Sequence, residues 1–239
     1  MALPHDRSGL LWNDGPTARF TKSMERWINA MYSDDPSDTD VITAGQSVSR
    51  IIAKEDGVLS GRPVLDYLIE NYCNGATTEW NFTEGQGFQK GQEIASIVAK
   101  SDEILKIERI CMNLITRLSG IASTTSKWSE QLGGVYLAAT RKTNWGVLDK
   151  WAVHIGGGLT HRLDRSDGLM IKENDFSMSK LTLEEILSTF RTATDFPVIE
   201  VVSSDQALSV ANSWIELQSG LLTTYPVSYT HLTLPTNHP

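Results

Sequence analysis

Four polar segments in the second half of the chain carry residue types suited to binding anions. They stand at or beside apolar runs, or shortly after a run of glycines. The segments are Thr140–Thr143, His161-Arg162, Lys172–Asp175 and Glu200. In an α/β barrel the carboxyl ends of the strands meet at one mouth, so we expect these side chains to gather there. Two positive charges about 4 Å apart repel by roughly 4 kcal/mol at an effective dielectric near 20. A polyanion that offsets this repulsion is therefore the predicted ligand of Arg141, Lys142, Arg162 and Lys172.

Each of these residues also has a plainer interpretation. Lysine and arginine side chains often form solvated faces or surface ion pairs, and His161 could be a hydrogen-bonded structural histidine. Glu200 is the strongest candidate, because a carboxylate between apolar strand residues needs a polar partner. The run Gly156–Gly158 lacks the lysine of a phosphate-binding loop, so we interpret it as a helix end that allows close backbone approach.

Strands that alternate with helices are expected to position these segments. The expected strands are 135–139, 169–171 and 198–202, and the expected helices are 148–155, 182–192 and 205–217. Thr182 and Glu185 form a capping box at the start of the second helix. This order is typical of a parallel α/β sheet or barrel. A closed barrel needs more than these three units, so we expect it to be incomplete.

The first half of the chain predicts short strands and helices of a different arrangement. Residues 1–20 are polar and interrupted by proline and glycine, which indicates a loosely attached arm. The expected elements that follow are helices 20–31 and 64–72 and strands 47–53 and 94–99. Ser101 is predicted to cap a long helix whose apolar stripe runs from Ile104 to Ile121.

Composition narrows the classes of partner. The net charge of −8 argues against nucleic acid or an anionic membrane, which require an exposed basic field. Cys73 and Cys111 belong to no CxxC pair, so we interpret them as buried reduced thiols. No signal segment and no run of about 18 apolar residues is present, which predicts a cytoplasmic protein.

Residues 226–239 have neither a helical stripe nor a glycine turn. They resemble a translated sequencing adapter, so we interpret them as a non-native tail; a natural hairpin or a disordered end is the alternative. His231 and His238 are accordingly not taken as ligands. With its barrel cut short, the chain is expected to be an inactive fragment that exposes strand edges and aggregates or stays partly unfolded.

Taken in order, the motifs resemble the quinolinate phosphoribosyltransferase family, also called nicotinate-nucleotide pyrophosphorylase (carboxylating). The segments that carry the resemblance are Gly57–Gly61, Glu108-Arg109, Asn113, Ser119–Ala122, Thr140–Thr143, Asp149–Val153, Gly156–Arg162, Ile171–Asn174 and Ile199–Val201. It extends from about Thr39 to Gln218, and the ordered set is more specific than any single motif.

The resemblance implies an α/β fold and a pentosyltransferase activity. An α/β sandwich over residues 1–118, ending in a bridging helix, would precede a partial TIM-like phosphoribosyltransferase barrel over 119–225. Quinolinate and phosphoribosyl pyrophosphate would give nicotinate mononucleotide, pyrophosphate and CO2. Mg²⁺ would arrive with the pyrophosphate donor, and no protein metal site is expected.

The resemblance also implies residue roles, with Lys142, Lys172 and Glu200 catalytic. Charge-assisted hydrogen bonds to the two quinolinate carboxylates are expected from Arg141, Lys142, His161 and Arg162. Thr143 is a further expected substrate-binding residue. Lys172 would hold donor phosphates or the second carboxylate, and Glu200 would engage the ribose hydroxyls and stabilise an oxocarbenium-like centre. Arg109 would reach the active site of the other subunit in a homodimer.

The chain departs from the family pattern after Thr143. The segment Asn144–Asp149 is shorter than the usual family segment and lacks its Pro-Gly-x-Arg motif. Ser37–Asp40 only loosely matches the acidic Gly-Asp-x-Thr motif with which the family opens. The family's later strands, with their phosphate-binding loops, are absent. Two alternatives stay open. One is a transferase for nicotinate or another aromatic acid, and the other is a non-catalytic relative associated with molybdate transport.

Overall fold

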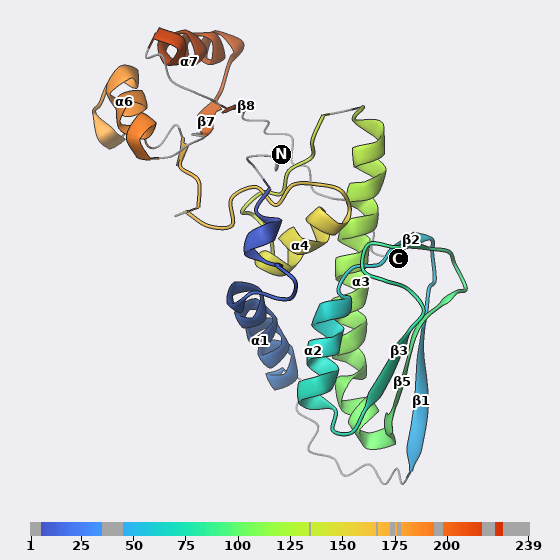
Figure 1. Ribbon diagram of the computed structural model, residues 1–239. Coiled ribbons are helices and arrows are strands. Elements are labelled where there is room, and N and C mark those ends of the chain that lie inside the picture. The colour runs from blue at the N-terminus through green and yellow to red at the C-terminus, as the bar shows by residue number, and fades with distance from the viewer. Residues whose placement is uncertain are drawn as a thin grey trace. The chain divides into compact units, whose positions relative to one another are not determined.

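The chain forms two compact units, Met1–His161 and Arg162–Pro239, which are described separately. The computed structural model, drawn in Figure 1, describes residues 6–34, 45–133, 135–165, 167–172, 175, 178–193, 198–216 and 223–226. The expected boundary between two domains after residue 118 stays a prediction. Within the described residues, no helix is long and apolar enough to cross a membrane.

The first unit contains an antiparallel sheet with strand order β1-β5-β3. These strands are β1 (Gln46–Ile52), β5 (Glu93–Lys100) and β3 (Thr77–Trp80), and a separate pair joins β2 (Gly57–Val58) to β4 (Gly87–Phe88). The central strand β5 buries most of its apolar residues, as the alternation in its sequence predicts. Figure 1 shows the three strands running together beside the long helix α3, which contacts both β1 and β5.

Helix α3 (Ser101–Gln131) is central to the packing of this unit, and α2 (Arg62–Tyr72) packs on it. The apolar stripe predicted for α3 is confirmed, since Ile104, Ile107, Leu114 and Leu118 are buried. The cap predicted at Ser101 is wrong: Lys100 precedes the helix, and no side chain caps it. The Ser101 hydroxyl instead donates to the carbonyl oxygen of Gly45 at 3.2 Å, so it bonds to the residue directly before β1.

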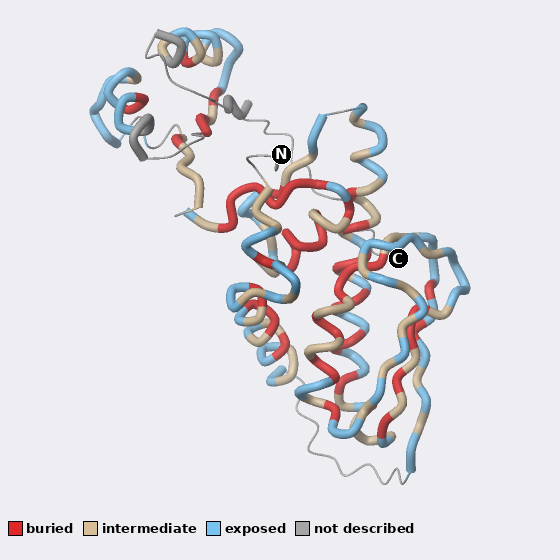
Figure 2. The backbone as a smooth tube through the Cα atoms, viewed as in Figure 1, coloured by how far each residue is buried: buried red, intermediate tan, exposed pale blue. Residues whose placement is uncertain are grey.

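The N-terminal segment is not the loose arm that its composition indicated. Residues 6–17 include a 3-10 helix, η1 (Ser8–Leu10), and lead into α1 (Ala18–Ser33). Leu11 and Phe20 are fully buried, and the Trp12 ring stacks on Trp151 of helix α4 with centroids 5.6 Å apart. Figure 2 shows most of this segment as exposed or intermediate, and among residues 6–17 only Leu11 is buried. Its few apolar side chains are enough to anchor it against α4.

Helix α4 (Val147–Ile155) matches the expected helix, but the expected strand before it is wrong. Residues 135–139 form one parallel bridge, Ala138 with Leu159, in place of a strand. The reason is exposure at the start of the segment, where Tyr136 keeps 61% of its surface accessible. After α4, a Cβ on Gly156 would lie 2.3 Å from the carbonyl oxygen of Ala122. The interpretation of the glycine run as a site of close backbone approach is therefore confirmed.

The second unit contains a parallel sheet with strand order β6-β7-β8. The strands are β6 (Met170–Ile171), β7 (Val198–Val201) and β8 (Thr223–Pro226), and the helices are α6 (Leu183–Ala193) and α7 (Ser204–Glu216). One hydrophobic core joins the strands of this sheet to α6 and α7. Its buried residues are Ile171, Ile186, Leu187, Ile199, Val201 and Val210. The capping box is confirmed, because Thr182 accepts from the Glu185 amide at 3.3 Å while Glu185 accepts from the Thr182 amide at 2.8 Å.

The parallel sheet expected from the strand–helix alternation is thus present in the second unit. The interpretation of residues 226–239 lies outside the described residues except at Pro226, which ends β8 opposite Val201.

Candidate functional site

Lys172 and Glu200 form an ion pair at the carboxyl ends of two neighbouring parallel strands. Strand β6 pairs with β7 through Met170–Val198 and Ile171–Ile199, so Lys172 and Glu200 come next in register. The Lys172 Nζ lies 3.2 Å from Glu200 Oε2. The polar partner expected for Glu200 is therefore present. Both side chains remain partly exposed, at 43% and 21%, and an ion pair of this kind contributes at most about 1 kcal/mol. A ligand can replace such a pair at little cost.

Arg162 is buried and bonds to the segment that leads into β6. Its Nη1 donates to the carbonyl oxygen of Gly168 at 3.2 Å, and its Nη2 lies 3.6 Å from the sulfur of Met170. The guanidinium therefore steadies the entry to β6. The expected contact of Arg162 with a substrate carboxylate stays a prediction.

The predicted substrate loop of the first unit presents its cations to solvent. Arg141 and Lys142 are exposed, while Thr143 is half-buried and donates its hydroxyl to the carbonyl oxygen of Gly146 at 3.3 Å. The Lys142 amide donates to the hydroxyl of Thr140 at 2.9 Å, which turns the loop after Ala139. The loop is thus tied to the start of α4 and leaves two positive side chains outside.

His161 is buried, and its backbone has a φ of +51°, a left-handed conformation that few residues other than glycine adopt. It stands near the loop of Arg141, because the bridge of Ala138 with Leu159 aligns the two segments in parallel. A strained residue next to polar loops is characteristic of functional sites. Within the first unit, the structure therefore brings the two predicted segments side by side.

Lys150 was missed as a site residue by sequence reasoning. It is 2% exposed, and its Nζ donates to the carbonyl oxygen of Thr160 at 3.0 Å. This bond holds the peptide that precedes His161. A lysine beside Trp151 and Ala152 in an apolar helix is a signal that could have found it, because a buried ammonium needs acceptors.

Asp149 fixes the same region to α3. Its carboxylate accepts two hydrogen bonds from Arg117, at 2.9 Å from Nε and 2.8 Å from Nη2, and a third from the Trp145 amide at 3.0 Å. The Arg117 guanidinium also lies 4.8 Å from the centre of the Trp145 ring. Bidentate, charge-assisted pairs of this kind are strong and directional. They hold the turn between Thr143 and Val147 in place.

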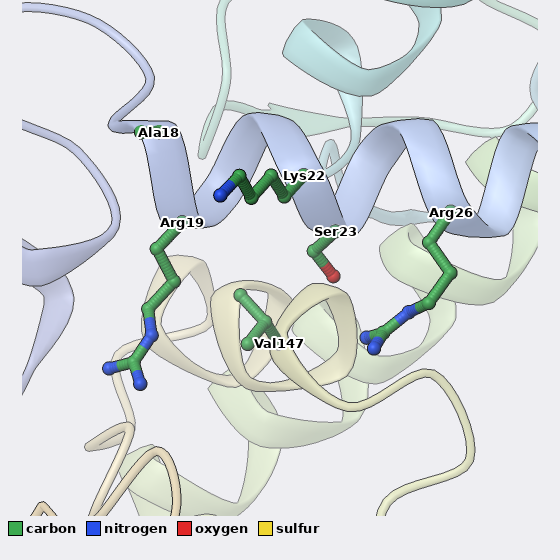
Figure 3. Close-up of a pocket in the computed structure, with 6 residues that line it drawn as sticks. All are labelled: Ala18, Arg19, Lys22, Ser23, Arg26 and Val147. Carbon is green, nitrogen blue, oxygen red and sulfur yellow. The ribbon is translucent and has the colours of Figure 1, made fainter.

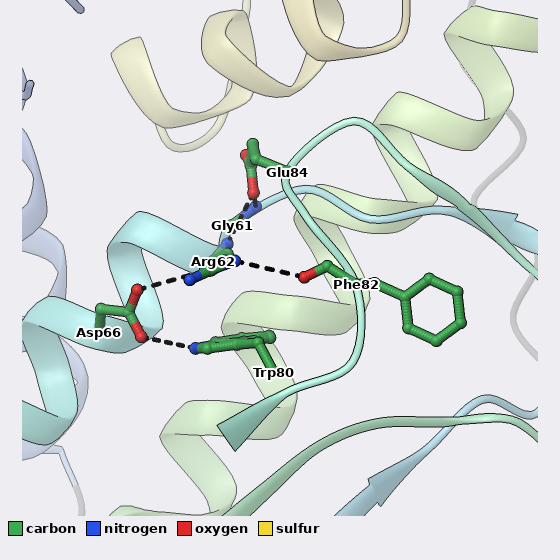
Figure 4. A network of polar contacts seen from close by, with 6 residues as sticks. All are labelled: Gly61, Arg62, Asp66, Trp80, Phe82 and Glu84. Carbon is green, nitrogen blue, oxygen red and sulfur yellow. Dashed lines mark hydrogen bonds and ion pairs between the residues drawn. The ribbon is translucent and has the colours of Figure 1, made fainter. Parts of the chain in front are cut away.

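Glu84 is a second carboxylate that the sequence analysis did not single out, and it is partly buried. It accepts from the amides of Gly61 and Arg62, each at 2.9 Å, and from the Trp151 indole at 2.9 Å. Figure 4 shows the carboxylate directed at the start of α2, where Arg62 also pairs with Asp66. Burial raises the pKa of Glu84 above its ordinary value, although the amides of Gly61 and Arg62 act in the opposite direction. Glu84 therefore connects α2 to α4.

Arg109 lies on the exposed face of α3, as its position off the apolar stripe predicts. Its Nη2 donates to the carbonyl oxygen of Met31 at 3.3 Å. Its expected role in a partner's active site stays a prediction.

The cysteines are buried, as expected, and burial raises the pKa of Cys111 to about 12. Within the described residues, no three His, Cys, Asp or Glu side chains gather as a metal site.

The predicted site residues thus form two groups. Arg141, Lys142, Thr143 and His161 belong to the first unit, and Arg162, Lys172 and Glu200 belong to the second. Their convergence at one barrel mouth stays a prediction.

Two protein families match the chain in tandem. Residues 38–119 match the family described as "Quinolinate phosphoribosyl transferase, N-terminal domain", and residues 121–217 match "Quinolinate phosphoribosyl transferase, C-terminal domain". These two matched ranges include every predicted site residue from Arg109 to Glu200.

Individual relatives agree with these matches. The chain is 31% identical over 171 residues to "Quinolinate phosphoribosyltransferase [decarboxylating] 1" of Nicotiana glauca, covering 68% of this chain and 49% of that protein. It is 35% identical over 167 residues to "Probable nicotinate-nucleotide pyrophosphorylase [carboxylating]" of Archaeoglobus fulgidus, covering 67% and 64%. The crystal structure of NadC from Streptococcus pyogenes superposes with a TM-score of 0.72 at 26% identity, covering 82% of this chain and 73% of that one. The chain spans about half the length of the plant relatives.

Proposed function

This chain belongs to the quinolinate phosphoribosyltransferase family, and on that premise we propose that its protein transfers phosphoribosyl from phosphoribosyl pyrophosphate to quinolinate. The bond from the ribose anomeric carbon to pyrophosphate breaks, and a bond from that carbon to the pyridine nitrogen forms. The carboxylate adjacent to the nitrogen then leaves as CO2, and a proton takes its place. The products are nicotinate mononucleotide, pyrophosphate and CO2, so the reaction belongs to NAD biosynthesis.

The observation that carries the proposal is the ion pair of Lys172 with Glu200 at adjacent strand ends. The glutamate supplies negative charge where positive charge develops on the ribose, and the lysine supplies positive charge for phosphate or carboxylate. When a donor binds, the ammonium exchanges the glutamate for a phosphate oxygen and the carboxylate is released toward the ribose hydroxyls. Both partners are exposed enough to make that exchange.

The remaining substrate contacts are assigned to the first unit and to Arg162. In the proposal, Arg141, Lys142 and Arg162 bind the two carboxylates of quinolinate, with Thr143 and His161 completing the set. Holding the acceptor nitrogen in line with the anomeric carbon supplies much of the acceleration. The buried bonds of Lys150 and Asp149 support this role, because they hold the segments on which these side chains stand.

Three further elements belong to the same proposal. Mg²⁺ enters as part of the phosphoribosyl pyrophosphate substrate. The active protein is a homodimer in which the exposed Arg109 serves the partner's site. Its compartment is the cytoplasm, consistent with the composition of the sequence.

The test is formation of nicotinate mononucleotide from quinolinate by a clone that continues the reading frame beyond Tyr225. We expect product with the wild type and a loss of about 100-fold or more in kcat with Glu200→Gln, because one electrostatic contact to the transition state is removed. Arg50→Met is the matched control, since it removes an exposed ion pair with Glu93 elsewhere in the chain. Absence of product with a purified, folded wild type would overturn the proposal and favour a non-catalytic relative.

A second candidate is a transferase for nicotinate or another aromatic acid. It is favoured by the short turn after Thr143, where Gly146 takes a φ of +56° directly before α4. An enzyme for quinolinate needs cations for both carboxylates, whereas one for nicotinate needs them for one. Competition between the two acids under equal donor concentration separates the candidates, because only the true substrate suppresses turnover of the other at low concentration.

A further inference from the structure

Three cations line one face of the first helix. Arg19, Lys22 and Arg26 follow one another at spacings of three and four residues on α1, and all three are exposed. Side chains at these spacings stand next to each other on a helix. None of them belongs to the predicted substrate set. The cluster is therefore a concentrated positive patch on a chain whose net charge is −8.

This arrangement is unfavourable for the helix by itself. Like charges at such spacings repel each other and destabilise the helix. The cluster also lies in the amino-terminal half of α1, whose first turn contains no acidic residue, so the positive end of the helix dipole adds to the repulsion. The nearest carboxylate on the same helix, Glu25, accepts from the Tyr67 hydroxyl at 3.1 Å. In the part of the chain that the structure describes, no ion pair joins Lys22 or Arg26 to a carboxylate.

The cations surround a hollow that contains a buried hydroxyl. A space of about 440 Å³ is lined by Ala18, Arg19, Lys22, Ser23, Arg26 and Val147. Figure 3 shows Arg19 and Arg26 reaching from α1 to either side of Val147, with the Ser23 hydroxyl pointing between them. Ser23 is 3% exposed, and among the described residues its Oγ has no hydrogen-bond partner. A buried hydroxyl without a partner is unfavourable, because it has lost its hydrogen bonds to water.

The opposite wall of the hollow is also electropositive. Val147 is the first residue of α4, and the preceding Gly146 provides no side-chain cap. The amino-terminal end of a helix favours negative charge. The acidic residue in that first turn, Asp149, is already bonded to Arg117. Three cations and one hydroxyl of α1 thus line the same space as the first residue of α4.

We propose that this hollow binds the phosphate group of a small anionic molecule, at a site separate from the predicted substrate residues. Arg19, Lys22 and Arg26 neutralise the phosphate, and Ser23 donates to one of its oxygens. Binding removes three costs together: the repulsion among the cations, the unfavourable dipole and the unpaired hydroxyl. It would also connect α1 to the start of α4, and through Gly146 to the loop that carries Arg141 and Lys142.

The first test is titration with inorganic phosphate at constant ionic strength, followed by calorimetry on the protein used for the activity assay. The variant Arg19→Gln/Lys22→Gln/Arg26→Gln is expected to bind at least about tenfold more weakly, because charge-assisted hydrogen bonds are lost. The control Lys54→Gln/Lys90→Gln/Lys127→Gln removes the same charge from exposed positions elsewhere and should change affinity by less than about twofold. Equal weakening in the two triple variants would overturn the site in favour of nonspecific attraction.

A further variant separates this hollow from the predicted substrate loop. Arg141→Gln/Lys142→Gln should keep the phosphate binding that the α1 triple variant loses. If the affinity follows Arg141 and Lys142 instead, phosphate binds at the predicted substrate residues and the proposal is wrong.

The variant Ser23→Ala provides a separate test, in which the direction of the change in melting temperature is informative. Without phosphate, Ser23→Ala should leave the melting temperature unchanged or raise it, because an unpaired buried hydroxyl is removed. With saturating phosphate, the gain in melting temperature should be smaller than in the wild type. Ser129→Ala is the matched control, because Ser129 Oγ is also buried without a partner and lies outside the hollow. A phosphate-dependent gain that is the same in both variants and the wild type would exclude Ser23 from the site.

Discussion

Three charged residues of the first unit and one ion pair of the second unit are held in different ways. In the first unit, Asp149 and Lys150 are buried and Glu84 is partly buried, and each bonds to a partner ten or more residues away in the sequence. In the second, Lys172 and Glu200 meet in a partly exposed ion pair. A buried charge that loses its partner is left uncompensated where water does not reach it, whereas an exposed charge is solvated by water when its pair breaks. The first group therefore positions the backbone, and the second is available for a ligand.

The largest expected effect on stability comes from breaking the buried pair of the first unit. Arg117→Met leaves the Asp149 carboxylate, whose side chain is 5% exposed, without its two charged hydrogen bonds. We expect the free energy of unfolding to fall by about 3 kcal/mol, measured by urea denaturation. The double variant Arg117→Met/Asp149→Asn should recover part of the loss. A change below about 1 kcal/mol would show that Asp149 finds solvent in place of arginine.

A slightly smaller loss is expected where α4 ends against α3. Gly156→Ala places a Cβ 2.3 Å from the carbonyl oxygen of Ala122, so the backbone must shift, at a cost of about 1–3 kcal/mol. Gly120→Ala is the control, since nothing lies within 4 Å of its Cβ on α3, and it should stabilise the helix by up to about 1 kcal/mol. Thermal denaturation of both variants measures the difference. Equal effects would mean that the two helices are not closely packed at Gly156.

Glu84 should make the stability of the first unit depend on pH. Burial raises its pKa above 4.5, so between 4.5 and the raised value the folded chain binds more protons than the unfolded one. The free energy of unfolding that this residue contributes therefore falls as pH rises through that window. Denaturation of the wild type and Glu84→Gln at several pH values measures it. The wild type should lose stability relative to the variant as pH increases, and an opposite slope would show that the hydrogen bonds outweigh burial.

The smallest effect on stability is expected at the exposed pair. Lys172→Met should change the free energy of unfolding by less than about 1 kcal/mol, because the pair is solvated. Under the proposed function, the same variant should reduce turnover by about 100-fold. A variant that loses stability and activity in proportion would remove the contrast between the two units.

Much of the local structure was predictable because its causes are local. The apolar stripe of α3 depends on spacing within one helix, and the capping box of Thr182 with Glu185 depends on residues three apart. The need of Glu200 for a partner also followed from its apolar neighbours in the strand. Two of the predictions that were wrong had remote causes. Residues 6–17 are held by Trp151, and the Ser101 hydroxyl bonds to Gly45.

The sequence by itself determined the order of motifs, the periods of the helices and strands, and the residue types available for binding an anion. The tertiary structure decided which charged side chains hold other segments of the backbone in place. Glu84 bonds to α2 and α4, and Lys150 bonds to Thr160, through contacts that no spacing rule indicates. The reason is physical: desolvation and hydrogen bonding depend on which groups fold around a charge. The same folding placed Arg19, Lys22 and Arg26 around Ser23 and the start of α4.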